Sequence, residues 1–436
     1  MGPKNNELPH SRKDKMPMRV LITGQSYHPA FNGQAVFTVN LAEGLAARGH
    51  EVMVVASSDC KRPYCQTRNG VQIRRLGAIS LSRWHRDAAL TPFPDRALGK
   101  ILREFRPHIV HIQDHYPISR SAVRLARLQG IKTLGTNHFM PQNLKPYLGW
   151  LAQVGGDALD WLLWHWMLHL YNQLDFVTAP SRTAVAILQR VGLTTPAFPV
   201  SCGVDVEFFR PLPHLDPLAW RRHFQLAPDR TVFLYVGRVD GEKRLDILLH
   251  ACQRLQDTPI QLAIAGRGAA QDELQRLAQK LGLGDRVRFL GFVPQEELPA
   301  LLNSVDIFAM PSDAELLSIA TLEAMACGRP VLAARGQALP ELITEGVNGL
   351  LFRPGDPADA ARQMARLVQM RDAWAQMGQA NRTKAEFHHV GKTVEIYEQI
   401  YGSLVSDMPS PYVSARRPSR PIFPRKVQEL LTQFRH

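Results

Sequence analysis

The segment PSDAELLSIATLEAMACGRPV, residues 311–331, decides how the rest of the chain is interpreted. It follows an apolar run, Asp306–Met310, that is typical of a buried strand, and it predicts a loop that enters a helix. Gly328 suits the position just past a helix end, and Pro330 cannot continue a helix. We therefore expect a strand, a loop and a helix in series, with Glu315 at the helix entrance.

The same segment carries two carboxylates. Free N–H groups and the positive end of the helix dipole would favour an anionic ligand beside Glu315. Glu323 falls among alanines, where a buried carboxylate is costly unless donors such as ribose hydroxyls reach it. Spacing alone favours a plainer interpretation, in which Glu315 is an ordinary charge near a helix start and Glu323 is a surface residue.

Short apolar runs alternate with helical patterns through both halves of the chain. Many of these runs are continuously apolar, as parallel strands buried on both faces are. The expected strands are Arg19–Thr23, Val52–Ala56, Ile109–Gln113, Lys132–Thr136, Phe176–Ala179, Val232–Gly237, Gln261–Gly266, Val287–Gly291, Asp306–Met310 and Pro330–Ala333. The alternation predicts an α/β protein with two doubly wound, Rossmann-like domains that face each other across a cleft.

The domain boundary is expected near Cys202–Pro213, a Pro-containing stretch with few strand signals. After about residue 404 the chain becomes rich in Pro, Arg and Ser. The predicted division is a flexible basic N-terminus (1–17), an acceptor-binding domain (18–204), a nucleotide-sugar-binding domain (205–384), a helix packing back on the first domain (385–404) and a flexible basic tail (405–436).

Composition limits the classes of function. Of the 436 residues, 45% are hydrophobic and 21% charged, which is ordinary for a globular protein. The five cysteines match no zinc or redox spacing and favour a reducing, cytoplasmic location. No apolar run approaches the roughly 20 residues of a membrane span. The net charge of +13 is concentrated in residues 1–205, with 24 Lys and Arg against 13 Asp and Glu, so this half would attract an anionic surface.

The Glu-x7-Glu spacing, continued as Glu-Ala-Met-Ala-Cys-Gly-x-Pro, resembles the signature of the retaining glycosyltransferase family 4, whose members have the two-domain GT-B fold. Six further motifs occur in the family's order. They are Phe31–Gln34, Thr136–His138, Ser201–Asp205 (with Cys202 where the family has Asn), Val236–Lys243, Gly266–Gly268 and Gly291–Val293. The resemblance covers nearly the whole chain before the tail.

The resemblance implies a role for each site residue. Departure of a nucleoside diphosphate builds negative charge, which Arg238 can grip bidentately and Lys243 can balance as a point charge. Glu315 would contact the donor sugar, Glu323 the ribose, and His138 the sugar or acceptor from the opposite domain. The remaining substrate-binding residues implied are Gly33, Gly266, Val293, Leu316, Leu317 and Ser318.

The family also implies metal-independent transfer of a hexose from a nucleotide-sugar donor, with retained anomeric configuration and no cofactor. Front-face attack by the acceptor hydroxyl removes the need for an enzyme nucleophile. One departure concerns the donor sugar: Leu317 and Ser318 stand where the family often has Phe and Gly.

The acceptor is expected on the N-terminal domain. Residues 138–171 hold Trp150, Trp161, Trp164, Trp166, Tyr147 and Tyr171, and basic residues occur at 83, 86, 96, 100, 103 and 106. Aromatic side chains beside basic ones suit a membrane interface, although core packing is the slightly better explanation for any single Trp. The His-Phe-Met-Pro stretch also resembles family members that glycosylate lipids.

We therefore expect a peripheral enzyme on the inner face of the cell membrane that glycosylates a lipid such as diacylglycerol or a phosphatidylinositol-type lipid. Three alternatives stay open: a soluble transferase for a small molecule or polysaccharide, a non-catalytic nucleotide-sugar-binding protein, and a sugar-nucleotide epimerase of the same fold. Nucleic acid is not an expected partner, because no recognition motif accompanies the basic charge.

Overall fold

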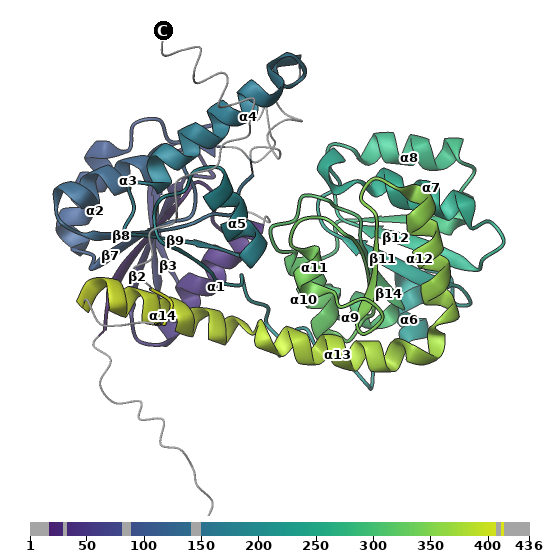
Figure 1. The fold of residues 1–436 in the computed structure, drawn as a ribbon. Coiled ribbons are helices and arrows are strands. Elements are labelled where there is room, and N and C mark those ends of the chain that lie inside the picture. Colours follow the sequence, from purple (N-terminus) through teal and green to yellow (C-terminus); the bar gives the residue numbers. More distant parts are fainter. Residues whose placement is uncertain (1–16, 29–32, 81–88, 141–149, 407–410, 414–436) are drawn as a thin grey trace, which may run out of the picture.

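The computed structural model describes residues 17–28, 33–80, 89–140, 150–406 and 411–413. Two α/β domains lie side by side, and a pair of long helices runs along both of them (Figure 1). Almost all of the predicted extensions, 1–17 and 405–436, lies outside the described residues. No helix among those described is long and apolar enough to cross a membrane.

The N-terminal sheet has eight strands in the order β10-β9-β8-β7-β1-β2-β4-β3. All neighbours are parallel except β3 and β4, which pair antiparallel. The strands are β1 (Arg19–Gly24), β2 (Glu51–Ser57), β3 (Tyr64–Arg68), β4 (Val71–Leu76), β7 (Ile109–Ile112), β8 (Lys132–Thr136), β9 (Phe176–Ala179) and β10 (Ala197–Pro199). A separate short pair is formed by β5 (Ile79–Ser80) and β6 (Ala89–Leu90).

Helices cover both faces of this sheet. One buried cluster joins a sheet face to α2 (Asp95–Phe105), α3 (Pro117–Leu128), α4 (Trp150–Tyr171) and α5 (Arg182–Arg190). The other cluster joins the opposite face to α1 (Gly33–Ala47) and α14 (Val390–Ser406). The central strands are therefore buried on both sides, which explains their continuous apolar runs.

The C-terminal sheet has six parallel strands in the order β13-β12-β11-β14-β15-β16. They are β11 (Thr231–Val236), β12 (Ile260–Ala265), β13 (Val287–Gly291), β14 (Ile307–Met310), β15 (Val331–Ala334) and β16 (Gly349–Phe352). The helices are α6 (Pro217–His223), α7 (Leu245–Arg254), α8 (Gln271–Lys280), α9 (Leu298–Ser304), α10 (Ile319–Ala326), α11 (Leu339–Leu342), α12 (Pro357–Gln369) and α13 (Trp374–Phe387).

Each sheet has one point where the strand order reverses direction. In the first sheet the chain moves outward from β1 to β2 and β4 and then returns to β7, on the other side of β1. In the second sheet β11 and β14 flank the equivalent point. Ligands of open α/β sheets bind outside the carboxyl ends of the strands at such switch points. The prediction of two doubly wound, Rossmann-like domains is thus confirmed.

Several elements differ from the sequence prediction. β3, β4, β10 and β16 were not expected; β10 has only three residues, and β3 is polar and largely exposed. The helix within 311–331 is shorter than predicted, since Ser318 is its N-cap and α10 begins at Ile319. Glu315 therefore lies in the loop three residues before the cap, and the expectation that it stands at the helix entrance is wrong.

The helix α14 returns from the C-terminal domain to pack on α1 of the first domain (Figure 1). A buried charge fixes it there: Glu398 accepts hydrogen bonds from Arg48 and His50, both at 2.9 Å. The predicted return helix, 385–404, overlaps the end of α13 and most of α14.

The two domains also meet at the start of α5. Ser181 caps this helix by accepting from the Ala184 amide at 3.1 Å. The next two amides, of Arg182 and Thr183, donate across the domain boundary to the Glu341 carboxylate at 3.2 and 2.7 Å. A carboxylate at a helix N-terminus satisfies free amides and gains from the helix dipole.

We expect Glu341→Ala to loosen this contact, because charge-assisted hydrogen bonds contribute about 1.5–3 kcal/mol. Hydrogen exchange at the Arg182 and Thr183 amides should accelerate, and small-angle scattering should report a larger radius of gyration. Glu345→Ala, which removes a more exposed ion pair with Arg335, is the control and should change neither. Unchanged exchange at both amides would contradict the role assigned to Glu341.

Candidate functional site

An ion pair spans the switch point of the C-terminal sheet. Lys243 belongs to the short 3-10 turn Gly241–Lys243 that follows β11, and Glu315 lies in the loop that follows β14. The Lys243 Nζ lies 2.6 Å from Oε1 of Glu315. Two predicted site residues that are 72 positions apart in the chain are thus brought together.

The charges around this pair alternate in sign. Arg238 donates to Asp240 and to Glu242, and Glu242 also lies 3.6 Å from Nζ of Lys243. Burial disfavours the charge on Lys243, but Glu315 and Glu242 outweigh it, so the pKa of the ammonium is raised. The Arg238 side chain is 37% exposed and that of Lys243 is 18% exposed, so both cations remain partly accessible. The arrangement presents two oriented cations at the end of β11.

Glycines let the neighbouring loops approach one another. The Gly266 amide follows β12 with φ +141°, and a Cβ there would lie 1.7 Å from the carbonyl oxygen of Gly237. A Cβ on Gly268 would lie 2.3 Å from the carbonyl oxygen of Val239. Only glycine fits such backbone contacts. Gly266 thus lets the β12 loop lie against the loop that carries Arg238, and its predicted contact with the substrate stays a prediction.

The loop between β14 and α10 reaches into the other domain. Leu316 is buried in the core cluster formed by α2, α3, α4 and α5, and Leu317 packs against core residues of both domains. The Ser318 hydroxyl accepts from the Thr321 amide at 3.2 Å, so it acts as the helix cap.

The other predicted donor-side residues lie in different settings. Glu323 is on α10, partly exposed, and burial raises the pKa of its carboxyl to about 8. Val293 is buried in the core of the C-terminal domain, after β13. Gly33 is the first residue of α1, and a Cβ there would lie 3.7 Å from Cδ1 of Ile319 on α10. Phe31 and Asn32 of the same motif lie outside the described residues.

His138 follows β8 at the carboxyl edge of the N-terminal sheet. Its Nε2 lies 3.0 Å from Oε1 of Gln113, and its ring packs on Phe37 of α1 with 4.7 Å between centroids. Burial lowers the pKa of His138 to about 3, so the imidazole is neutral. It can donate or accept a hydrogen bond but does not supply a positive charge.

The sequence analysis missed Asp114, which lies at the switch point of the first sheet. This buried carboxylate accepts from the Gln25 amide after β1, from Ser119 at 2.7 Å and from the Tyr116 amide at 3.2 Å. Burial raises its pKa. Its position directly after the predicted strand Ile109–Gln113 was the available signal, because the contact with the Gln25 amide joins residues 89 positions apart.

The aromatic stretch is mixed in character. Trp164 and Tyr171 are buried, so core packing is the correct interpretation for them. Trp166 is 39% exposed and lies under the guanidinium of Arg120, 4.3 Å from the ring. Tyr147 and the basic residues 83 and 86 lie outside the described residues, as does the Trp150 side chain. A recess of about 650 Å³ beside α2, lined by Arg19 and Arg74 among others, shares no residue with this site.

Comparison with known proteins gives two family matches that together span both domains. Residues 31–208 match Glycosyltransferase Family 4, and residues 218–384 match Glycosyl transferases group 1. A D-inositol 3-phosphate glycosyltransferase of Frankia alni is 31% identical over 77% of this chain and 86% of its own length. The chain belongs to glycosyltransferase family 4. This glycosyltransferase is also 27% identical to the sulfoquinovosyl transferase SQD2 of Arabidopsis thaliana, over 86% of this chain and 68% of that protein.

Solved structures agree on the fold. Anabaena HepE in complex with UDP-glucose superposes on 90% of this glycosyltransferase and all of its own chain, with a TM-score of 0.71 and 19% identity. The two Rossmann-like domains are therefore those of the GT-B fold, and the chain is an enzyme that transfers a sugar from a nucleotide donor. The Lys243–Glu315 pair lies at the carboxyl edge of its C-terminal sheet.

The raised pKa of Glu323 predicts how the stability of this glycosyltransferase depends on pH. The unfolded carboxyl releases its proton near 4.5, whereas the folded one keeps it up to about 8. Between these values the unfolded state binds fewer protons, so the free energy of unfolding should fall as the pH rises. Glu323→Gln should remove this dependence, measured by denaturant unfolding at pH 5, 6, 7 and 8.

The quantity to compare is the difference in the free energy of unfolding between wild type and variant at each pH. Glu395→Gln, an exposed change on α14, should give a constant difference. A constant difference for Glu323→Gln as well would show that its carboxyl is already ionised in the folded protein.

Proposed function

We propose that this enzyme transfers a hexose, with retention of configuration, from a nucleotide sugar to a hydroxyl of a membrane lipid such as diacylglycerol or a phosphatidylinositol-type lipid. The observation that carries the donor half is the Lys243–Glu315 ion pair at the switch point. The acceptor half rests on the exposed apolar and basic side chains of the N-terminal domain.

The donor side supplies what diphosphate departure requires. Lys243 and Arg238 are oriented cations at the end of β11, held in place before any donor binds. Such preorganised groups stabilise developing negative charge without reorganising, and removing one donor commonly costs a factor of about 100–1,000 in rate. We propose that they replace a metal ion, with Glu315 on the donor sugar, Glu323 on the ribose and amides of residues 316–318 on the phosphates.

The acceptor side would include His138. A neutral imidazole can orient a hydroxyl of the sugar or the acceptor by a hydrogen bond. Gly33 and Val293 would line the sugar and base ends of the donor. In front-face transfer the departing phosphate itself takes the proton from the acceptor hydroxyl, so His138 does not have to act as a general acid or base.

The lipid assignment rests on helices α2, α3 and α4, which cover one face of the N-terminal sheet (Figure 1). Exposed apolar side chains occur at Phe93 just before α2, which is 91% exposed, and at Leu162 and Trp166 on α4. The same helices carry exposed basic residues: Arg96, Lys100, Arg103, Arg124 and Arg127. Apolar anchors beside basic side chains suit an anionic lipid surface, and we propose peripheral attachment to the cytoplasmic leaflet.

The first test is a screen of UDP-, GDP- and ADP-sugars with membrane lipid extract, in the presence and absence of a chelator. We expect a lipid-linked product whose anomeric configuration, read by NMR, matches that of the donor, and no effect of the chelator. Stimulation by a water-soluble sugar instead of lipid would select the soluble transferase. Donor binding without any transfer would select the non-catalytic alternative.

With the active donor, Lys243→Ala and Glu315→Gln should each lower kcat by about 100-fold or more, because each removes a preorganised charge. Arg230→Ala breaks a surface ion pair with Asp285 in the same domain and should retain activity. Wild-type rates in Lys243→Ala or Glu315→Gln would contradict the catalytic assignment.

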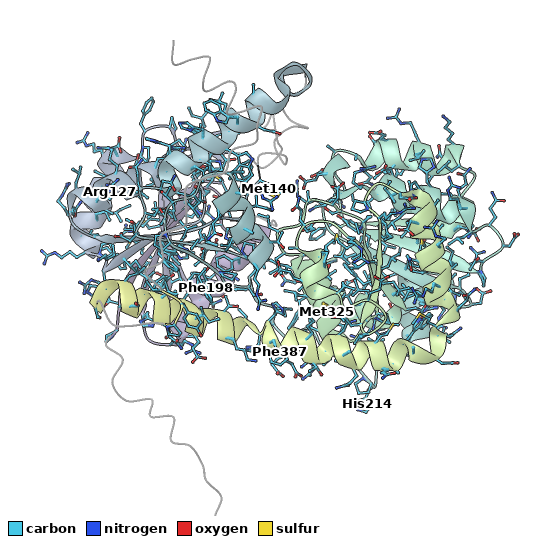
Figure 2. All side chains as sticks on the ribbon, viewed as in Figure 1. Arg127, Met140, Phe198, His214, Met325 and Phe387 are labelled. Carbon is cyan, nitrogen blue, oxygen red and sulfur yellow. The ribbon has the colours of Figure 1, made fainter. Side chains whose placement is uncertain are left out.

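Binding to vesicles tests the lipid surface separately. The protein should bind vesicles of anionic phosphatidylglycerol but not neutral vesicles, and its affinity should fall as the salt concentration rises. Phe93→Asp should weaken binding about tenfold, since burying a Phe side chain contributes about 1.5–3 kcal/mol. The control is Phe387→Asp, which changes an exposed aromatic side chain at the end of α13, away from α2 to α4 (Figure 2). Equal losses in both variants, or no salt dependence, would overturn the proposed surface.

A further inference from the structure

A file of hydrogen bonds runs from His138 through the sheet to the returning helix α14. His138 Nε2 lies 3.0 Å from Gln113 Oε1, and Gln113 Nε2 lies 3.1 Å from His111 Nε2. His111 Nδ1 lies 2.7 Å from the Tyr401 hydroxyl. The last three residues of this four-residue file, Gln113, His111 and Tyr401, are almost completely buried.

The orientation of the Gln113 amide, with Oε1 toward His138 and Nε2 toward His111, sets the direction of this file. A carbonyl oxygen only accepts, so His138 donates from Nε2–H. The amide nitrogen of Gln113 only donates, so Nε2 of His111 accepts and its proton is on Nδ1, facing Tyr401. Burial lowers the pKa of both imidazoles, so each ring carries one proton. The lone pair of His138 is then on Nδ1.

A second group of contacts supports α14 and meets the file at His111, whose Nε2 also lies 2.7 Å from Thr136 Oγ1. The Tyr397 hydroxyl lies 3.0 Å from Thr136 Oγ1 and 2.9 Å from Thr178 Oγ1. The Phe37 ring stands between Tyr397 and His138, at 5.8 and 4.7 Å between centroids. Tyr397 and Tyr401 are one helical turn apart on the same helix, so the effect of replacing one can be compared with the effect of replacing the other.

We propose that Gln113, His111 and Tyr401 are positioning residues that fix the ring orientation and tautomer of His138 for its contact with a substrate hydroxyl. The proposal rests on the proposed function only for the identity of that contact. It adds that a helix arriving from the C-terminal domain sets the hydrogen-bonding state of a side chain at the edge of the N-terminal domain. Sugar transfer would then depend on α14 being seated.

The tautomer can be read in the free enzyme by ¹⁵N NMR of protein labelled at histidine, with His138→Asn to assign the signal. The file predicts protonated Nε2 and unprotonated Nδ1 for His138. Tyr401→Phe removes the acceptor for His111 Nδ1–H, so His111 and the Gln113 amide should reverse and the proton of His138 should move to Nδ1. Tyr397→Phe removes a buried hydroxyl that reaches His111 only through Thr136, so the contacts of His111 with Gln113 and Tyr401 remain and the tautomer should be unchanged.

A His138 signal with the proton on Nδ1 in wild type, or one unmoved by Tyr401→Phe, would overturn the proposal. Because this measurement needs no donor or acceptor, it decides the positioning role even if no transfer is found. Thermal unfolding of Tyr401→Phe and of Tyr397→Phe shows whether loss of either buried hydroxyl unfolds the protein. If Tyr401→Phe does not fold, Gln113→Glu provides the second test of the proposal.

Gln113→Glu places a carboxylate against Nε2 of His138 and stabilises the imidazolium. The titratable groups around it are His111 on β7, Asp114 after β7, and Tyr397 and Tyr401 on α14. Transfer by this variant should show a new acidic limb, with activity regained as the pH rises, while wild type shows none from His138. We also expect kcat to fall about 10-fold in Tyr401→Phe with the donor KM unchanged, on the scale of outer partners of metal-bound histidines.

A purely structural role for Gln113 predicts an equal loss at every pH and a loss in Tyr397→Phe as large as that in Tyr401→Phe. Either result would reject the proposal while leaving the transferase assignment in place. If donor turnover is absent in wild type, the proposed function fails, and the tautomer measurement still stands.

Discussion

The partly buried ion pair between Lys243 and Glu315 is the constraint on which the donor side depends. It joins the segments that follow β11 and β14, the two strands that flank the switch point of the second sheet. Loss of Glu315 would leave Lys243 with Glu242, whose carboxylate lies 3.6 Å from Nζ. The pair fixes the turn that carries Lys243 and the loop that continues to Leu316 in a single arrangement.

That loop extends the constraint to the whole molecule. Leu316 is next to Glu315 in the chain, but its side chain is buried in the core of the other domain. The interface gains a second contact where Glu341 accepts the first amides of α5, and a third where α14 seats on α1 through Glu398. The groups proposed for donor and acceptor thus belong to one connected structure. The contacts that hold the two domains together also orient the site.

Much of this could be predicted from the sequence because the signals are local. Buried parallel strands give continuous apolar runs, and glycines mark turns where a Cβ would collide, as Gly266 does against Gly237. The spacing of Glu315 and Glu323 and the order of the motifs identified the family and hence the fold. β3 and the start of α10 were missed, because the largely exposed residues of β3 show no apolar run and the apolar residues Leu316 and Leu317 precede the helix without a break in pattern.

The sequence by itself determined the two Rossmann-like domains, the family and which residues belong to the donor motifs, because each follows from patterns within about twenty neighbouring positions. Only the tertiary structure decided which charges meet. Lys243 with Glu315, Asp114 with the Gln25 amide, and His138 with Gln113 join residues from different strands. Such pairings depend on strand order and on the seating of α14, and neither is encoded in the local spacing of residue types.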